Sequence, residues 1–284
     1  MILVTGATGK VGSELVQQLI AGGQAVRALV RDPQKASASL PTAVELSRGD
    51  LSDAESIEEA LAGVEKMFLL APVDPRMVEM EQHATAAAKA AGVNHLVKLS
   101  AIGADPNSPR FFLGVHGTSE QTIRDAGVPF TFLRPNFFMQ NLLTSAATIK
   151  QQGAIYQPAG DSSASFIDAA DIAAVAAKVL TSDGHQNKTY TLTGPQSLTY
   201  TQVAEVFSRV LGKPVKYIDV PRDAAKQGMM QSGLPDWLAE GICQLVDAAR
   251  EGQMETVSTD VRNILGRGGR TLEEFLRENR DAFA

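Results

Sequence analysis

Short apolar runs alternate with stretches of helical periodicity over the first 135 residues. The apolar runs predict six strands, over residues 2–4, 25–30, 44–46, 67–71, 94–100 and 130–133. Between them, apolar side chains at helical spacing predict helices over 11–20, around Ile57, over 77–91 and over 118–126, with a loop over 101–112. This alternation predicts an α/β fold with a doubly wound parallel sheet, whose ligand crevice lies at the carboxyl ends of the strands.

The rhythm changes after residue 136. Helical spacing recurs over 137–151, 172–180 and 200–211, and strand-like runs cover 188–192 and 215–220. The remainder of the chain is mostly helical in pattern. We therefore expect a first domain over 1–136 and a smaller mixed α/β C-terminal lobe over 137–284, partly interleaved with the main sheet. Asp168 and Asp171 are expected to cap the helix that follows them.

Three glycines follow the first apolar run at the spacing of a dinucleotide-phosphate turn. Gly6 would allow the sharp turn, Gly9 would let the backbone approach a pyrophosphate, and Gly12 would permit close packing of helix on strand. A glycine triplet alone is a weak signal, but this one lies between a buried strand and a helix. The N-terminus of that helix would supply unpaired N–H groups to the phosphates. The first domain is thus predicted to be a Rossmann-like nucleotide-binding domain.

The residue after the second strand indicates which nicotinamide cofactor is preferred. Arg31 occupies that position with Lys35 one turn later, which favours NADP(H), because arginine accommodates a 2′-phosphate. NAD(H) stays open as the second cofactor, because the adjacent Asp32 would weaken the preference and Arg31 could equally be a plain surface charge. Asp50 follows the third strand, where it would accept a hydrogen bond from the adenine amino group or cap the next helix.

Composition excludes several other classes of function. The 284 residues are 44% hydrophobic with a formal net charge of −6, which argues against a nucleic-acid platform. A single cysteine and four scattered histidines predict no disulfide framework and no metal site. A strand beginning at residue 2 leaves no room for a leader, and no apolar run approaches the roughly 18 residues of a membrane span. We therefore expect a cytoplasmic protein.

Reductases of this architecture often use a tyrosine with a lysine four residues later. The four tyrosines here are followed at that spacing by Gly160, Gly194, Ala204 and Pro221, so the pair is absent. A GxSxG motif is also absent, which argues against a serine hydrolase.

Several segments together resemble the NmrA-like atypical short-chain dehydrogenase/reductases, and within them the bacterial quinone and triphenylmethane reductases. These segments are the TGATGxxG opening, LVRDPQK, GDLSD, HGTSEQTIRDAGVPFTFLRPNFFMQN and TLTGPQSLTYTQVAEVF. The resemblance is most specific over 1–51 and 114–141. It implies NADP(H) as cofactor, with contacts at Thr5, Gly6, Thr8, Gly9, Lys10, Val11, Arg31, Asp50, Leu51 and Ala71. It further implies that Ser100, Ala101 and the turn beginning at Pro135 flank the nicotinamide.

In these relatives the tyrosine–lysine pair is replaced by histidine and glutamate, matched here by His116 and Glu120. Loss of the tyrosine would impair ketone reduction, which develops an alkoxide that needs a proton. A quinone or a cationic dye absorbs the incoming charge in its own π system, so hydride transfer needs mainly proximity and orientation. His116 is accordingly the candidate catalytic residue, as proton donor to a hydroquinone oxygen. The alternative is an i,i+4 His–Glu pair that only stabilises its helix.

Aromatic and sulfur-containing side chains in the lobe are candidates for the wall of an acceptor pocket. Planar substrates favour such walls, and the candidates are Phe137, Phe138, Met139, Phe166 and Trp237. Phe137 and Phe138 rank first because they directly follow the sixth strand.

Two functions are consistent with these features. The preferred one is an NADPH-dependent oxidoreductase that passes hydride to a quinone or a similar small planar conjugated acceptor. The alternative is a non-catalytic NADP(H) sensor that binds a regulatory protein, as some NmrA-like members do. The full C-terminal lobe with its aromatic residues favours the enzyme. Monomer and homodimer both stay open.

Overall fold

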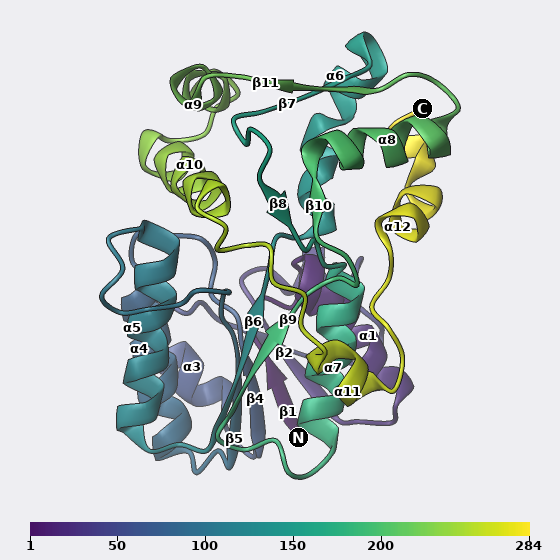
Figure 1. Ribbon diagram of the computed structural model, residues 1–284. Coiled ribbons are helices and arrows are strands. Elements are labelled where there is room, and N and C mark those ends of the chain that lie inside the picture. The colour runs from purple at the N-terminus through teal and green to yellow at the C-terminus, as the bar shows by residue number, and fades with distance from the viewer. The chain divides into compact units, whose positions relative to one another are not determined.

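The computed structural model describes residues 1–284, which form two compact units (Figure 1). The first unit contains Met1–Ser108, Leu113–Pro135 and Ala169–Thr191. The second contains Pro109–Phe112, Asn136–Asp168 and Leu192–Ala284. The assignment of 1–136 and 137–284 as two functional domains stays a prediction.

A seven-stranded sheet forms the centre of the first unit, in the order β3-β2-β1-β4-β5-β6-β9. The strands are β1 (Ile2–Val4), β2 (Val26–Val30), β3 (Glu45–Arg48), β4 (Lys66–Leu69), β5 (His95–Leu99), β6 (Phe130–Pro135) and β9 (Lys188–Leu192). Neighbouring strands from β3 to β6 pair in parallel, as the doubly wound prediction requires. The predicted count of six strands was too low, because the strand expected in the lobe at 188–192 joins this sheet beside β6.

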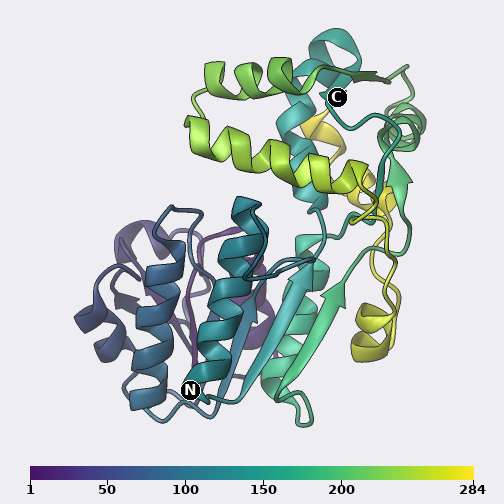
Figure 2. The ribbon, with the colours of Figure 1, turned by 60° about the vertical axis from the view of Figure 1, so that its left-hand side comes forward.

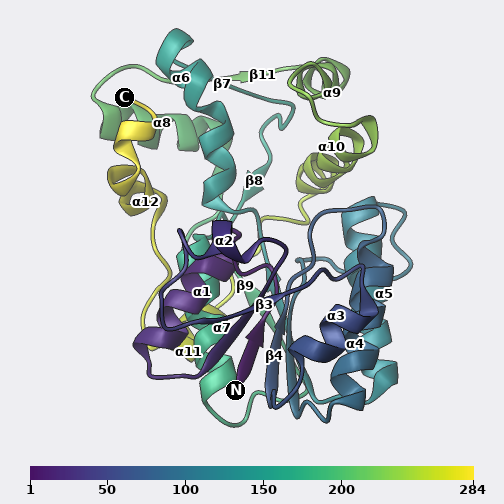
Figure 3. The same ribbon diagram turned by 180° about the vertical axis from the view of Figure 1, so that it is seen from behind.

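Helices cover both faces of the sheet (Figures 1 and 3). One face carries α3 (Ala54–Ala60), α4 (Met77–Ala90) and α5 (Phe111–Ala126), and the other carries α1 (Lys10–Ala21) and α7 (Ala169–Thr181). A short helix, α2 (Pro33–Ala36), follows β2. Beneath α3 and α4, the buried side chains of Ile57, Met80 and Ala84 pack with Leu3 and Met67 of the strands. Burial of both sheet faces explains why the central strands β1 and β4 are almost continuously apolar, whereas the edge strands β3 and β9 carry polar residues.

Helix α5 begins at Phe111, seven residues before the predicted start at residue 118. The loop predicted over 101–112 therefore ends two residues too late, and Gly114 and Gly117, which lower helix propensity, lie within the helix. Gly117 serves packing, since a Cβ there would lie 2.1 Å from the carbonyl carbon of Asp105. The close approach of these two backbones therefore requires glycine.

The second unit combines two small sheets with helices, as Figure 2 shows from another side. Strand β7 (Ala154–Gln157) pairs in parallel with β11 (Lys216–Asp219), and β8 (Ser163–Ala164) pairs antiparallel with β10 (Leu198–Thr199). The helices are η1 (Met139–Ser145), α6 (Ala146–Gln152), α8 (Tyr200–Leu211), α9 (Arg222–Gln231), α10 (Asp236–Arg250), α11 (Asp260–Leu265), α12 (Leu272–Glu278) and η2 (Arg280–Ala282). No helix of the chain combines the length and the apolar character needed to cross a membrane.

The single helix predicted over 137–151 was wrong in its first half. The backbone over 137–139 is held extended, because Ile167 N–H donates to the Phe137 carbonyl and Met139 N–H donates to the Ile167 carbonyl. A 3₁₀ segment, η1, follows, and the α-helix begins only at Ala146.

Candidate functional site

Six strands of the first unit end at the same edge of the sheet, and nearly all the predicted cofactor residues follow these ends. The glycine turn follows β1, Arg31 follows β2, and Asp50 and Leu51 follow β3. Ala71 follows β4, Ser100 and Ala101 follow β5, and Pro135 closes β6. In an open α/β sheet, this edge is where ligands bind.

The turn after β1 has the backbone shape that its glycines predict. Gly6 has a φ of +63°, a left-handed conformation that favours glycine. A Cβ on Gly12 would lie 2.1 Å from the Gly6 carbonyl oxygen, so only glycine lets α1 begin so close to the turn. The Thr5 hydroxyl accepts from Leu70 N–H at 2.8 Å and donates to the Leu70 carbonyl at 3.0 Å. These two bonds connect the start of the turn to the end of β4.

The N-terminus of α1 presents backbone N–H groups that no side chain satisfies. Gly9 is the N-cap and makes no side-chain cap bond, and the first amide bonded back to it is that of Ser13, at 2.9 Å. The amides of Lys10, Val11 and Gly12 therefore lack helical acceptors and carry the positive end of the helix dipole. Thr8 and Lys10 are exposed beside them. This cradle fits the pyrophosphate of a dinucleotide.

The acidic residue beside Arg31 is committed to local structure. Asp32 caps α2, accepting from the amides of Gln34 and Lys35 at 3.1 Å each. The Lys35 ammonium pairs with the same carboxylate at 3.4 Å and its side chain is 88% exposed. Arg31 is exposed at the strand end. The carboxylate that would weaken a preference for NADP(H) is thus occupied, while the guanidinium faces solvent.

Asp50 is held by the turn that follows β3. Its carboxylate accepts from Ser52 N–H at 2.9 Å and from the Ser52 hydroxyl at 2.7 Å. These bonds, together with the charges of Arg31 and Arg76, lower the pKa of Asp50. The N-cap of α3 is Asp53, so the alternative that Asp50 caps this helix is wrong. Arg76, which the sequence reasoning missed, adds a second cation to this corner.

The ends of β5 and β6 are joined by backbone and side-chain bonds. Ser100 N–H donates to the Leu133 carbonyl at 2.7 Å, and Ile102 N–H donates to the Pro135 carbonyl at 3.0 Å. The Ser100 hydroxyl donates to Glu120 Oε1 at 2.6 Å. Hydrogen bonds therefore hold together the ends of β5 and β6, where the residues predicted to flank the nicotinamide lie. Leu51 and Ala71 are buried, so each would contact a cofactor only through its backbone or a small part of its side chain.

His116 and Glu120 lie one turn apart on α5, yet each has its own partners. Glu120 is fully buried and is bound by Ser100, Arg124 and Arg134. The half-buried His116 ring instead has its Nδ1 3.5 Å from the Lys98 ammonium. The alternative of an i,i+4 His–Glu pair that stabilises the helix is therefore wrong.

Lys98 and Glu81 form a buried ion pair that the sequence reasoning also missed. The side chains are 0% and 1% exposed, and the ammonium lies 2.6 Å from each carboxylate oxygen. The signal in the sequence was a lysine in the middle of the apolar run at 94–100. Burial of the His116 ring, with the Lys98 charge beside it, lowers the pKa of His116 well below its usual value.

The predicted acceptor-wall residues fall into two groups within the second unit. The ring centroids of Phe137 and Phe166 lie 6.2 Å apart. The Phe166 ring also packs edge-on against that of Tyr200, with 5.7 Å between centroids. Trp237 instead contacts Phe111, at 5.4 Å between ring centroids. The structure therefore brings Phe137 and Phe166 together and gives Trp237 a different aromatic neighbour.

Phe138 and Met139 are held by the extended segment before η1. Phe138 forms a parallel bridge to Ile167, while Met139 and Phe166 border a cavity too small to admit a ligand. Asp168 directly precedes α7, where its carboxylate accepts from Gln140 at 2.8 Å and pairs with Arg270 at 3.0 Å. Capping by Asp168 and Asp171 stays a prediction, as do the acceptor contacts.

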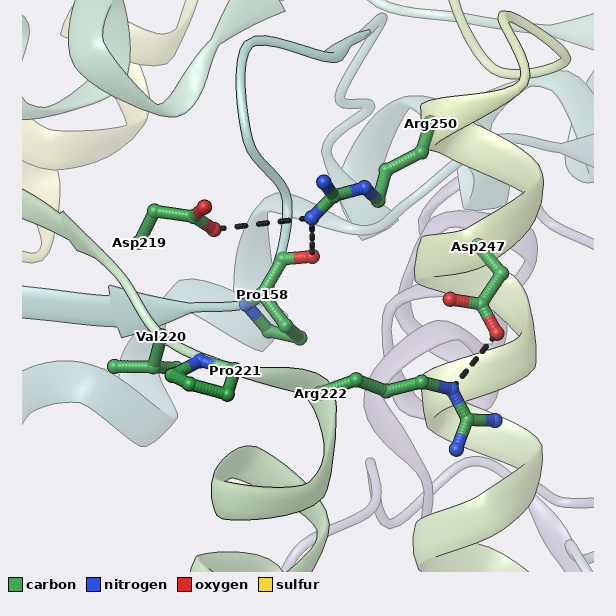
Figure 4. Close-up of a pocket in the computed structure, with 7 residues that line it drawn as sticks. All are labelled: Pro158, Asp219, Val220, Pro221, Arg222, Asp247 and Arg250. Carbon is green, nitrogen blue, oxygen red and sulfur yellow. Dashed lines mark hydrogen bonds and ion pairs between the residues drawn. The ribbon is translucent and has the colours of Figure 1, made fainter.

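A cavity of about 530 Å³ in the second unit is lined by none of the predicted site residues (Figure 4). Pro158 and Asp219 line one side, and Arg222, Asp247 and Arg250 line the other. Arg222 pairs with Asp247 at 2.9 Å, and Arg250 donates to the Pro158 carbonyl at 2.9 Å. Both guanidinium groups are therefore already engaged by the protein.

Comparison with known proteins gives close matches over the full chain. NAD(P)H azoreductase of Xenophilus azovorans is 40% identical over 283 residues, covering 100% of this chain and 99% of the relative. The NADPH complex of the Escherichia coli NADPH-dependent quinone oxidoreductase matches with a TM-score of 0.91 and 31% identity, over 99% of this chain and 100% of that one. The Citrobacter triphenylmethane reductase complexed with NADP(H) matches with a TM-score of 0.89 and 30% identity, over 98% and 99% of the two chains.

The family assignment follows from the whole length of the sequence. The profile of the NmrA-like family matches residues 1–276, which include all of the first unit and most of the second. The glycine turn, the arginine after β2 and the histidine–glutamate spacing on α5 all lie within that match. The chain therefore belongs to the NmrA-like family.

Proposed function

We propose that the protein is an NADPH-dependent oxidoreductase that transfers hydride directly to a quinone or to an extended, dye-like conjugated acceptor. The observation that carries this proposal is the cradle of free amides at α1 followed by Arg31, in a chain whose full-length relatives are named as reductases. Those relatives include an azoreductase, a quinone oxidoreductase and a triphenylmethane reductase. Azo dyes, quinones and triphenylmethane dyes share a planar conjugated system.

The chain's own residues would hold the cofactor in four places. The amides of Lys10, Val11 and Gly12 would bind the pyrophosphate, and Arg31 would bind the 2′-phosphate. Asp50 would accept from the adenine amino group, and the braced ends of β5 and β6 would flank the nicotinamide. The bound cofactor supplies a hydride at its nicotinamide ring.

The tyrosine of the first unit, Tyr190 on β9, lies 2.9 Å from His185 Nδ1 and has no lysine four residues later, so the proposed acceptors are ones that need no tyrosine acid. A quinone spreads the incoming charge over its ring and oxygens, and a cationic dye is neutralised by it. Orientation beside the cofactor then contributes most of the rate. His116 would donate a hydrogen bond to the oxygen that becomes a hydroxyl, a need that a carbon-centred dye cation lacks.

Aromatic side chains of the second unit would supply the acceptor wall. Phe137 and Phe166 are the pair best placed to do so, because they lie together directly after β6 and beside β8. Phe138, Met139 and Trp237 remain further candidates.

The test is NADPH oxidation with a panel of acceptors. We expect turnover with a quinone, an azo dye or a triphenylmethane dye, and little with a simple aldehyde, whose alkoxide would need a strong proton donor. The Gly9→Val variant is the matched control, because it should lose nucleotide binding and keep the fold. Tight NADPH binding without turnover on any conjugated acceptor would contradict the reductase and favour a nucleotide sensor.

A further inference from the structure

Lys98 is a buried cation for which the cofactor site has no direct use. Its side chain is 0% exposed on β5, and both oxygens of Glu81, on α4, lie 2.6 Å from its ammonium. An ion pair this deep has a large desolvation cost and adds little net stability. Stability of the fold alone therefore does not account for this ion pair.

The ammonium also faces one nitrogen of His116. Nζ lies 3.5 Å from Nδ1, and 3.4 Å from the Leu99 carbonyl oxygen. Neutral imidazole carries one proton, on either nitrogen. A proton on Nδ1 would point at a positive charge, whereas the Nδ1 lone pair is attracted to it. The geometry therefore favours the tautomer in which Nδ1 is unprotonated.

The other nitrogen, Nε2, is left for a ligand. It has no hydrogen-bond partner in the protein, and it is not among the buried unpaired polar atoms, so it reaches solvent. The ring lies on α5 one turn before Glu120, which binds Ser100 at the end of β5. His116 thus offers an N–H group near the sheet edge where the cofactor residues lie.

We propose that Glu81 and Lys98 are positioning residues that hold His116 as a neutral imidazole with its proton on Nε2. The catalytic purpose of this arrangement rests on the proposed reductase function. In that reaction, Nε2–H would donate a hydrogen bond to the quinone oxygen as charge develops there. The group would act as a fixed dipole, and the proton that completes the hydroquinone would come from water. Catalysis by His116 would then need no imidazolium.

The charged surroundings of the ring support a neutral form. The Lys98 ammonium lies 3.5 Å from Nδ1, and the Glu81 carboxylate of α4 lies 2.6 Å from that ammonium. Glu120, the acidic residue nearest on α5, is occupied by two arginines and a serine. Burial and the Lys98 charge lower the pKa of His116, so an imidazolium is disfavoured at neutral pH.

Nitrogen-15 NMR of histidine-labelled protein tests the tautomer without any assay of activity. The chain has four histidines, and the His116 signals are identified by their loss in His116→Gln. We expect a protonated Nε2 and an unprotonated Nδ1, unchanged between about pH 5 and about pH 8. A protonated Nδ1, or a titration within that range, would overturn the proposal.

His95 provides an internal reference in the same spectrum. The Thr131 hydroxyl gives its hydrogen to the His185 carbonyl at 2.6 Å and therefore accepts from His95 Nε2, 2.8 Å away. His95 must then carry its proton on Nε2 as well. His95 is the first residue of β5 and Lys98 is the fourth, so their side chains point to opposite faces of the sheet.

The variant that isolates the positioning role is Lys98→Met with Glu81→Gln. Lys98→Met alone would leave the Glu81 carboxylate buried without a partner. The double variant removes both charges and so leaves no uncompensated buried ion. In the double variant we expect His116 to titrate nearer its ordinary range and to populate both tautomers, while His95 is unchanged. Quinone turnover should fall several-fold and become dependent on pH, with dye turnover and the KM for NADPH preserved.

The outcomes separate this inference from the proposed function. A His116 spectrum that is the same in the double variant would refute the role of Lys98, and the wild-type spectrum decides the tautomer even if that variant fails to fold. If the wild type shows the expected tautomer but reduces no acceptor, the reductase proposal fails while the positioning holds. If the double variant lost equal turnover with quinone and with dye, the proposed hydrogen bond from His116 to the quinone oxygen would be contradicted.

Discussion

Arg134 binds both carboxylate oxygens of Glu120, Oε1 through its Nε at 2.8 Å and Oε2 through its Nη2 at 2.6 Å. The same arginine donates to the Ala104 carbonyl at 3.1 Å. Because Glu120 also accepts from Ser100, this pair links β6, α5 and the loop after β5. Loss of the arginine would leave a fully buried carboxylate with fewer donors.

We expect Arg134→Met to lower the free energy of unfolding by about 2 kcal/mol, since hydrogen bonds to a buried charge are lost. Arg124→Met is the matched control. Arg124 reaches the same carboxylate at 3.0 Å but is more exposed, so its loss should cost about 1 kcal/mol or less. Urea unfolding measures both. Equal costs would contradict the bracing role of Arg134.

Arg31→Ala should weaken NADPH binding by about tenfold or more and leave NADH binding nearly unchanged, because only NADPH has a 2′-phosphate. Lys89→Ala, at the opposite end of α4 from the sheet edge, removes one positive charge as a control and should change neither affinity. Titration calorimetry with both nucleotides makes the comparison. Equal losses for NADPH and NADH would refute the role of Arg31.

Gly9 and Gly12 should respond differently to the same substitution. Gly9 has φ −83° and ψ 175°, an extended conformation open to any residue, and its Cβ would meet only the Gly6 carbonyl oxygen, at 3.2 Å. Gly9→Val should keep the fold and weaken NADPH binding about 100-fold or more. Gly12→Val should itself destabilise the protein by about 2 kcal/mol or more. Retained nucleotide binding in Gly9→Val would contradict the cradle.

His116→Ala should slow quinone reduction by about tenfold and change dye reduction less than about twofold, because the dye cation needs no donor at an oxygen. Gln121→Ala, on the exposed face of α5, is the control. Steady-state rates with both acceptors provide the measurement. A complete loss of turnover with both acceptors would mean that the need for a donor at an oxygen does not distinguish quinone from dye.

Glu240 should contribute stability that depends on pH. Hydrogen bonds from Arg222, then from Lys226, lower its pKa from 4.5 to about 2. A carboxyl group whose pKa is lower in the folded state stabilises fully above the unfolded value, and that contribution is lost as pH falls from about 4.5 towards about 2. The deficit of Glu240→Gln in urea unfolding should therefore shrink between about pH 6 and about pH 3. Glu205→Gln, on α8, controls for the lost charge; a deficit independent of pH would contradict the prediction.

Local signals predicted the elements that local interactions define. The expected helix over 200–211 is confirmed as Tyr200–Leu211, because a capping box at Thr199 and Gln202 begins it and the left-handed Gly212 ends it. The glycine turn after β1 could also be predicted from the sequence, because its function requires glycine at fixed spacing. The start of α5 was missed because Gly117 is there to admit another backbone, which only the packed fold reveals.

Contacts between distant segments could not be predicted in the same way. Lys98 and Glu81 are 17 residues apart on different elements, and nothing local indicates which acid meets a lysine placed in an apolar strand. The partners of Glu120 likewise come from β5 and β6 as well as α5. Family resemblance pointed to His116 and Glu120 as a pair. In the structure, Lys98 lies against the histidine, whereas Ser100 and two arginines bind the glutamate.

The cap on α2 has a consequence for redesign of cofactor preference. Asp32 lies next to the position from which an acid would bind a ribose hydroxyl, and its carboxylate is anchored by the amides of Gln34 and Lys35. Exchanging Arg31 alone would thus remove affinity for one nucleotide without creating it for the other. An engineer seeking an NADH-selective variant would need to rebuild the first turn of that helix as well, so that the acid is released.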